Sequence, residues 1–210
     1  MNLSLPRDYS LIAPVYDQIF NKILSQGHYE IGQLLKYKSK NKKLNVLEVG
    51  IGSGLTLDYL PHKISYTGVD INKQMLHLAK KKITNTSSPN VTLTLMDAQK
   101  LKFKTNTFNF VIAASVITAV HDPKKTIEEM IRVTKKNGYI VIVANIRNKK
   151  SIRSQLIKQL DPITKKILGF RTDLESDYFD NFKNLKLLRE APINTFMGLP
   201  LSSFLLLQKN

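Results

Sequence analysis

The sequence predicts an α/β fold: a doubly wound, mostly parallel seven-stranded sheet. Short apolar runs with the length of buried strands alternate with segments whose apolar residues recur at helical spacing. The 210 residues suit one domain with some additional elements. Of these residues 42% are hydrophobic, as in ordinary soluble globular proteins. Strands and helices that alternate in this way predict a parallel sheet with helices on both faces.

Seven apolar runs supply the predicted strands, and polar residues mark the helices between them. Asn72 and Asp122 are suited to cap two helices, and Asn137 with Gly138 predicts a left-handed stop after the second. The turn-rich segment 191–200 is expected to separate the last two strands. The predicted strands span residues 44–49, 66–69, 91–95, 110–116, 139–143, 185–188 and 201–207. The apolar faces of the two helices are Met75, Leu76, Ala79 and Ile83, and Ile127, Met130, Ile131 and Thr134.

We expect the chain to form a single domain, residues 1–210, in four parts. Residues 1–43 form an N-terminal helical lid or a helix packed on the sheet, and residues 44–145 form the ligand-binding core. Residues 146–184 form a basic helical insertion, and residues 185–210 hold the closing strands. Within the insertion, residues 147–171 contain eight basic residues and one acidic residue at amphipathic spacing. Such an element can lie on anionic lipid, or it can be a solvated helical insertion.

The charge balance predicts an anionic partner. Lys and Arg exceed Asp and Glu to give a net charge of +16, which suits nucleic acid, an anionic membrane surface, or a generic basic surface. The absence of cysteine excludes disulfides, thiolate metal sites and cysteine catalysis, and we expect no metal. The longest apolar segment, 110–120, has 11 residues, fewer than the roughly 18 needed to span a bilayer. Pro6, Arg7 and Asp8 interrupt the start where a secretory signal needs an apolar stretch, so we expect a cytoplasmic protein.

Three alternating glycines follow the first predicted strand. Gly50, Gly52 and Gly54 leave the backbone of this loop open to close approach by a ligand. The spacing differs from a dinucleotide fingerprint, because Gly54 comes two residues after Gly52 rather than three. Asp70 ends the second strand, 20 residues after Gly50, where it can accept hydrogen bonds from ribose hydroxyls. The loop and Asp70 together predict a ligand that contains a ribose.

Other polar and small residues also fall at predicted strand ends. Glu48 lies near the end of the first strand, Asp97 and Ala98 follow the third, and Ala114 and Ser115 lie near the end of the fourth. The carboxyl ends of parallel strands meet at one edge of an open α/β sheet, and ligands bind there. The sequence therefore predicts one site to which all of these residues contribute.

These motifs are similar, from residue 44 to residue 145, to those of the class I S-adenosylmethionine-dependent methyltransferases. Within that family, several segments resemble the soluble bacterial phosphatidylethanolamine N-methyltransferases. The segments are VLEVGIGSGLTLDYLP, GVDINKQML, LMDAQKLKF, VITAVHDPKKTIEEMIRVTKKNGYIVIVANI, ILGFRTD and, near the start, YSLIAPVYDQIF. The resemblance implies S-adenosylmethionine as the cofactor and a Rossmann-like sheet.

The resemblance also implies roles for the residues at the strand ends. Asp70 would bind the ribose, Asp97 would receive the adenine amino group, and Ala98 would offer a backbone donor. The helical spacing of Met75 also fits a core residue. The other implied cofactor contacts are Glu48, Gly50, Gly52 and Gly54 with the methionine part, Ile71 and Met75 with the adenine, and Ala114 and Ser115 beneath the sulfonium.

The acceptor implied by the resemblance is the amine of phosphatidylethanolamine and of its mono- and dimethyl derivatives, with phosphatidylcholine as the product. An ammonium must lose a proton before it can attack, and Tyr16, His121 or Tyr178 can assist, or solvent can suffice. We expect the catalytic residues to be Tyr16 and His121. We expect the substrate to contact Tyr9, Tyr16, Asn145, Arg147, Arg153, Arg171 and Tyr178. The expected partners are the phospholipid and the inner face of an anionic membrane, with no nucleic acid and no obligate protein partner.

Alternatives remain open at the level of sequence. A methyltransferase that acts on a soluble small molecule or a quinone precursor is the main one, and a non-catalytic cofactor-binding module is another. Methylation of RNA is disfavoured, because pyrimidine carbon-5 enzymes use a cysteine and this chain has none. The adenine amino enzymes carry an Asn/Asp-Pro-Pro-aromatic segment where this chain has Ala114-Ser115-Val116-Ile117.

Overall fold

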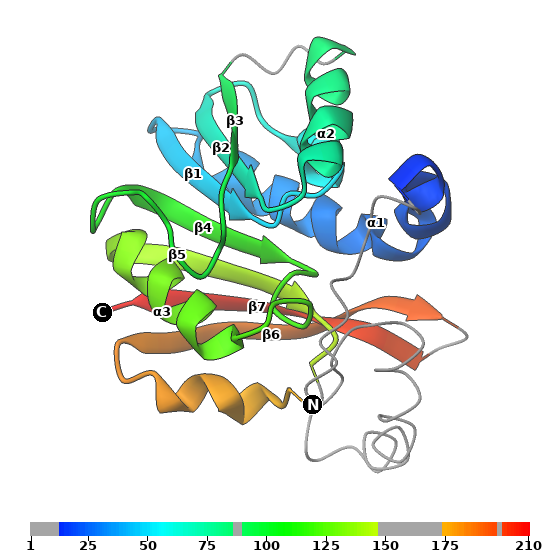
Figure 1. Ribbon diagram of the computed structural model, residues 1–210. Coiled ribbons are helices and arrows are strands. Elements are labelled where there is room, and N and C mark those ends of the chain that lie inside the picture. Colours follow the sequence, from blue (N-terminus) through cyan, green and yellow to red (C-terminus); the bar gives the residue numbers. More distant parts are fainter. Residues whose placement is uncertain (1–12, 86–89, 147–173, 197–198) are drawn as a thin grey trace, which may run out of the picture.

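One twisted sheet runs through the middle of the molecule (Figure 1). The computed structural model describes residues 13–85, 90–146, 174–196 and 199–210. Its strands are β1 (Leu44–Val49), β2 (Ile64–Asp70), β3 (Val91–Leu95), β4 (Phe108–Ala114), β5 (Thr134–Ala144), β6 (Leu185–Phe196) and β7 (Leu199–Lys209). They lie in the order β3-β2-β1-β4-β5-β7-β6. Strands β1 to β5 pair in parallel, and β7 is antiparallel to both β5 and β6, so the predicted mostly parallel seven-stranded sheet is confirmed.

Helices cover both faces of the sheet. They are α1 (Ala13–Lys38), η1 (Leu55–Tyr59), α2 (Lys73–Asn85), α3 (Pro123–Val133) and η2 (Ser176–Asn181). Val46 of β1 joins the core cluster formed with α1, η1 and α2, whereas the next residue, Leu47, joins the cluster formed with α3 and η2. Because successive side chains of a strand point to opposite faces, this alternation places one helical layer on each face. The doubly wound arrangement is therefore confirmed.

The starts of α2 and α3 follow the predicted capping residues. Asn72 Oδ1 accepts hydrogen bonds from the amides of Gln74 (2.9 Å) and Met75 (3.2 Å). Asp122 Oδ1 accepts one from the amide of Lys125 (3.0 Å), with Pro123 in the first turn. Each cap satisfies amides that have no acceptor inside the helix. Both helices therefore begin where the sequence predicts.

Several predicted boundaries were wrong, for identifiable reasons. The segment 191–200 is largely strand: β6 continues to Phe196, and Ala191 pairs with Phe204 across the β6–β7 ladder. As the edge strand, β6 tolerates Pro192, which has no amide proton to donate. The fourth strand ends at Ala114 rather than at residue 116, because Ser115 takes a left-handed conformation with φ of 63°. Asn137 is left-handed as predicted (φ 58°), yet it lies within β5, beside an irregularity in the β4–β5 register.

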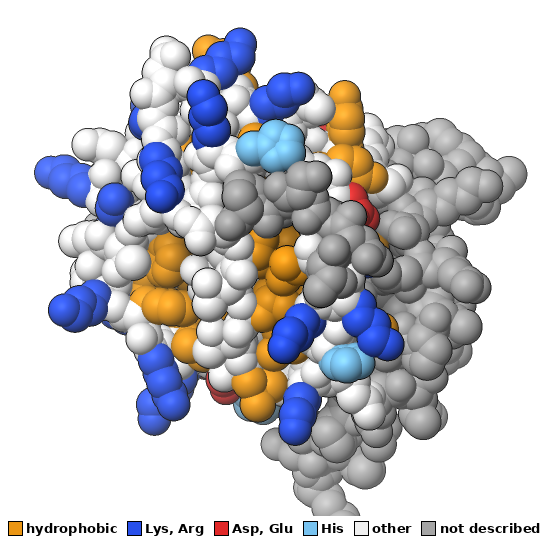
Figure 2. All heavy atoms as spheres, turned by 90° about the horizontal axis from the view of Figure 1, so that it is seen from above, with side chains coloured by type: hydrophobic (Ala, Val, Ile, Leu, Met, Phe, Trp, Pro, Cys, Tyr) orange, Lys and Arg blue, Asp and Glu red, His pale blue; other side chains and the backbone are white. Residues whose placement is uncertain are grey.

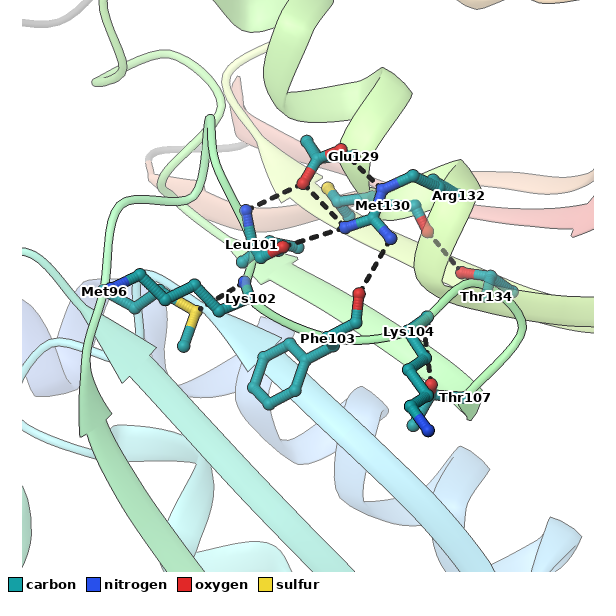
Figure 3. A network of polar contacts seen from close by, with 10 residues as sticks. All are labelled: Met96, Leu101, Lys102, Phe103, Lys104, Thr107, Glu129, Met130, Arg132 and Thr134. Atoms are coloured by element: carbon teal, nitrogen blue, oxygen red, sulfur yellow. Dashed lines mark hydrogen bonds and ion pairs between the residues drawn. The ribbon is translucent and has the colours of Figure 1, made fainter.

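An ion pair anchors the long connection between β3 and β4 to α3 (Figure 3). Arg132 Nε donates to Glu129 Oε1 at 2.7 Å, and its two terminal nitrogens donate to the carbonyls of Phe103 (2.8 Å) and Leu101 (2.9 Å). Glu129 Oε2 accepts from the amide of Leu101 at 2.7 Å. The hydrogen bond from Arg132 lowers the pKa of Glu129, with some opposition from burial. These contacts fix backbone groups of a connection that belongs to no helix or strand.

The predicted N-terminal part and the predicted basic insertion both include residues that lie outside the described part of the chain. The N-terminal helix is present as α1, which packs on η1 and β6, and its role as a lid stays a prediction. The basic segment 147–171 lies outside the described residues. None of the described helices is long and apolar enough to cross a membrane.

Candidate cofactor site

The loop after β1 turns back sharply on three left-handed glycines. Gly50, Gly52 and Gly54 have φ values of 65°, 58° and 81°. The amide of Ile51 donates to the carbonyl of Val69 at 3.0 Å, which ties the loop to the end of β2. A Cβ atom at Gly52 would meet no heavy atom within 4 Å, whereas one at Gly50 would overlap Val116. The backbone at Gly52 therefore faces open space that a ligand can enter.

Asp70 stands beside this loop at the end of β2. Its Oδ2 accepts a hydrogen bond from the amide of Gly52 at 2.8 Å, and its Oδ1 accepts one from the amide of Asn72 at 2.8 Å. Burial raises the pKa of Asp70, while the hydrogen bonds from Asn72 and Gly52 oppose that effect. The contact between Gly52 and Asp70 brings together two residues predicted to bind the same ligand.

Ile71 and Met75 follow Asp70 in very different environments. Ile71 is a large apolar side chain that is 72% exposed, next to the Asp70 carboxylate. An exposed apolar group beside a polar site can pack against the flat face of a ligand ring. Met75 is 4% exposed and lies in the first turn of α2, which fits its alternative interpretation as a core residue.

The residues after β3 and β4 lie at the same edge of the sheet. We call this the carboxyl edge: the residues that directly follow β1, β2, β3, β4 and β5. Asp97 Oδ1 accepts from the amide of Gln99 at 2.8 Å, and the Gln99 side-chain oxygen accepts from the amide of Asp122 at 3.1 Å. Gln99 therefore connects Asp97 to the start of α3. Ala98 and Ala114 are buried, and Ser115 is half-buried with its amide bonded to the carbonyl of Val143 (2.6 Å).

Glu48 has a different environment from the one expected for a direct ligand contact. The side chain is 1% exposed, Thr56 Oγ1 donates to its Oε1 at 2.7 Å, and the Tyr66 hydroxyl donates to its Oε2. Burial raises the pKa of Glu48 from 4.5 to about 7, although the two hydroxyl donors act in the opposite direction. Both carboxylate oxygens thus have protein partners, and the side chain presents almost no surface to a ligand. Its predicted contact with the methionine part of a cofactor stays a prediction.

The predicted catalytic and substrate residues divide into three groups. His121 is exposed, one residue before the cap of α3, and Asn145 is half-buried directly after β5, so both lie at or close to the carboxyl edge. Tyr178 is half-buried in η2 and makes edge contacts with Phe179 and Phe182. Tyr9, Arg147, Arg153, Arg171 and the side chain of Tyr16 lie outside the described residues.

The comparison with known proteins decides the family. A model described as a methyltransferase domain matches residues 47–142. The chain is 31% identical over 150 residues to a phosphatidylethanolamine N-methyltransferase of Cereibacter sphaeroides, covering 71% of this chain and 73% of that enzyme. This chain belongs to the class I S-adenosylmethionine-dependent methyltransferases. Its cofactor is S-adenosylmethionine.

Other comparisons match further methyltransferases. A ubiquinone/menaquinone biosynthesis C-methyltransferase of Rickettsia bellii is 30% identical over 160 residues, covering 71% of this chain and 64% of that enzyme. The solved structure of a SAM-dependent methyltransferase from Aquifex aeolicus superposes with a TM-score of 0.65 at 17% identity, covering 97% of this chain and 99% of that one. That structural likeness shows the fold alone.

The carboxyl edge of this methyltransferase fits its cofactor. The missing side chain of Gly52 leaves room above the loop, the Asp70 carboxylate would accept hydrogen bonds from ribose hydroxyls, and the exposed Ile71 side chain would pack against the adenine. The cofactor brings an activated methyl group on a sulfonium. The protein therefore has to bind the cofactor and the acceptor, orient them toward one another and exclude water.

Sequence reasoning missed three residues that support the site. Gln99 connects Asp97 to α3, and Thr56 and Tyr66 bind the Glu48 carboxylate. A buried strand glutamate requires partners, which was a signal that such donors exist, but the sequence does not indicate which residues supply them. No pattern marks Gln99, whose role depends on how two loops meet.

Proposed function

We propose that this methyltransferase transfers methyl groups from S-adenosylmethionine to the amine of phosphatidylethanolamine and of its mono- and dimethyl derivatives, giving phosphatidylcholine. The observation that carries the proposal is the 31% identity over 150 residues to a phosphatidylethanolamine N-methyltransferase. The segments that resemble this subfamily extend over the glycine loop, the end of β2 and the connection after β3, all of which contribute to the site described above.

The charge of the protein supports a lipid substrate that lies in an anionic surface. The net charge is +16, and Figure 2 shows Lys and Arg side chains spread over the viewed face, with few acidic ones among them. Each Lys or Arg close to an anionic bilayer contributes about 1 kcal/mol of attraction. We therefore propose that the enzyme works as a cytoplasmic protein that associates peripherally with the inner face of the membrane.

The proposed reaction places few demands on the chain beyond orientation and removal of a proton. The amine must be neutral to attack the methyl group, so a proton has to leave the ammonium first. His121 is exposed at the start of α3, where it can take up such a proton, and Tyr16 and Tyr178 are the other proposed participants. Asn145 can position the head group, and Arg147, Arg153 and Arg171 are proposed to bind the lipid phosphate.

A quinone precursor is the second candidate acceptor. The observation that favours it is the 30% identity over 160 residues to a ubiquinone/menaquinone biosynthesis C-methyltransferase. In that case methyl transfer would go to a ring carbon, and the lipid phosphate contacts would have no role.

One experiment separates these acceptors. The purified protein is incubated with radiolabelled S-adenosylmethionine and, in turn, with phosphatidylethanolamine, its mono- and dimethyl derivatives, and a demethylated quinone, and the products are separated by chromatography. The lipid proposal expects label in the phospholipids and none in the quinone. Asp70→Ala serves as the control, because it should abolish transfer to any acceptor. Label in the quinone alone would overturn the lipid proposal.

A further inference from the structure

A chain of four polar side chains crosses the core beneath the glycine loop. His28 Nδ1 lies 2.8 Å from Thr56 Oγ1, which donates to Glu48 Oε1 at 2.7 Å, and the Tyr66 hydroxyl donates to Glu48 Oε2. The four residues come from α1, η1, β1 and β2. Their exposed fractions are 6% for His28, 0% for Thr56 and 1% for both Glu48 and Tyr66. The chain therefore joins the N-terminal helix to the strand that carries the loop.

When Glu48 is ionised, the proton count fixes the direction of these hydrogen bonds. A threonine hydroxyl has one proton, and here it points to the Glu48 carboxylate. With the carboxylate ionised, the Thr56 oxygen can only accept from His28, so Nδ1 of His28 must carry a proton. The Glu48 carboxylate thus receives one donor on each oxygen, and the threonine is both donor and acceptor.

The chain also closes the base of the loop. Glu48 lies two residues before Gly50, and Thr56 lies two residues after Gly54, so the bond between their side chains joins the two ends of the segment that carries all three glycines. His28 then holds Thr56 from the opposite side, on a helix that packs against η1. Tyr66 belongs to the core cluster of this face, which also contains Ile51 and Leu57.

Packing alone does not require such a network. Polar groups buried among apolar side chains cost free energy unless every donor and acceptor is paired, and an apolar set of similar shape would fill the same space. A fully paired network of this kind specifies one geometry of the backbone that it joins. Here that backbone is the loop that faces the cofactor.

We propose that His28 and Thr56 are positioning residues for S-adenosylmethionine, which act through Glu48 to hold the glycine loop in its binding conformation. The inference rests on the cofactor and not on the proposed acceptor, so it stands or falls independently of the lipid substrate. It also gives Glu48 a role in cofactor binding that needs no exposed carboxylate.

Paired variants test the proposal by calorimetric titration with S-adenosylmethionine and with S-adenosylhomocysteine. Thr56→Val keeps the shape and removes the hydroxyl, whereas Thr56→Ser keeps the hydroxyl. His28→Leu removes the donor, whereas His28→Asn keeps an amide near the position of Nδ1. We expect Thr56→Val and His28→Leu to weaken binding of both compounds by about tenfold or more, the scale of one hydrogen bond in a charged network. Thr56→Ser and His28→Asn should stay within about threefold of the natural protein.

Two results would overturn the proposal. One is unchanged affinity in Thr56→Val and His28→Leu, and the other is equal loss in the conservative and non-conservative variants, which would indicate packing alone. A second measurement uses the natural chain and so does not depend on the folding of a variant. Long-range proton–nitrogen NMR spectra at pH 8 show which ring nitrogen of each histidine carries the proton. We expect His28 to carry its proton on Nδ1. A ring protonated on Nε2 alone contradicts the proposed direction of the network.

Discussion

The amide of Gly52 donates a hydrogen bond to Oδ2 of Asp70 at 2.8 Å. This contact joins the loop after β1 to the end of β2, so two residues predicted to bind the cofactor hold one another in place. Asp70 also accepts from the amide of Asn72, the residue that caps α2. One carboxylate thus sets the relative positions of the loop, the strand end and the helix start.

Substitutions in the glycine loop should separate binding from folding. Gly52→Ala has to adopt a φ of 58°, which costs roughly 1–2 kcal/mol for a residue with a Cβ atom, and that atom would enter the space expected for the cofactor. We expect a folded protein with strongly reduced affinity for S-adenosylmethionine. Gly50→Ala would overlap Val116 and should fail to fold stably. Circular dichroism melts and calorimetry measure the two effects, and full cofactor affinity in Gly52→Ala would contradict the assignment.

Asp70→Asn should weaken binding of the cofactor without a large change in the stability of the fold. An amide offers one acceptor oxygen where the carboxylate offers two, so either the Gly52 or the Asn72 amide loses its acceptor. The loss of charge also weakens the hydrogen bonds that ribose hydroxyls would donate. We expect affinity for S-adenosylmethionine to fall by about tenfold or more. Asp58→Asn, on the exposed side of η1, is the matched control and should bind normally.

Glu48 should give the free energy of unfolding a distinct pH dependence. Its pKa is raised from 4.5 to about 7 in the folded protein, so between these values the folded state holds a proton that the unfolded state has released. The stability that this proton contributes to the folded state is fully present below pH 4.5 and is lost as the pH rises through about 7. At about 1.4 kcal/mol per pH unit, this loss is about 3 kcal/mol.

Urea denaturation from pH 4.5 to pH 8 checks this expectation. Glu48→Gln cannot titrate, so its stability should fall less with rising pH than that of the natural protein over the same interval. Glu128→Gln, at an exposed position on α3, should behave like the natural protein. Equal slopes for Glu48→Gln and the natural chain would show that the buried carboxyl titrates normally.

Arg132 should stabilise the connection between β3 and β4 through its geometry as well as its charge. It binds the carbonyls of Leu101 and Phe103 together with the Glu129 carboxylate. We expect Arg132→Leu to lower the free energy of unfolding by about 1–2 kcal/mol. Arg132→Lys should recover only part of this, because an ammonium lacks the planar fork that reaches several acceptors. Chemical denaturation measures these free energies of unfolding. If Arg132→Lys were as stable as the natural protein, Arg132 would act by charge pairing alone.

The proposed membrane association should depend on electrostatics. Binding to vesicles that contain anionic phospholipid should weaken as salt rises, because screening shortens the range of the attraction. Replacement of Lys and Arg by Glu within residues 147–171 should reduce it further. Sedimentation of the protein with vesicles measures both effects. Equal binding to neutral vesicles, or binding that salt does not change, would reject this part of the proposal.

Local patterns in the sequence predicted much of the fold and, within the site, the glycine loop. The caps Asn72 and Asp122 and the glycine loop are defined by residues a few positions apart, so they were predictable. The strand character of 191–196 was not, because pairing with β7 outweighs the turn propensity of Pro192 and its neighbours. The links from Arg132 to Leu101 and from His28 to Thr56 join residues about 30 positions apart. Their geometry is set only when the helices pack.

The most direct test of the account is an experimental structure of the full chain with S-adenosylhomocysteine bound. We predict that the ribose hydroxyls bind the carboxylate of Asp70, that the amino-acid part lies over Gly52, and that Glu48 keeps its hydrogen bonds to Thr56 and Tyr66. A ligand bound away from the carboxyl edge, or a Glu48 carboxylate released from both partners to contact it, would contradict the account.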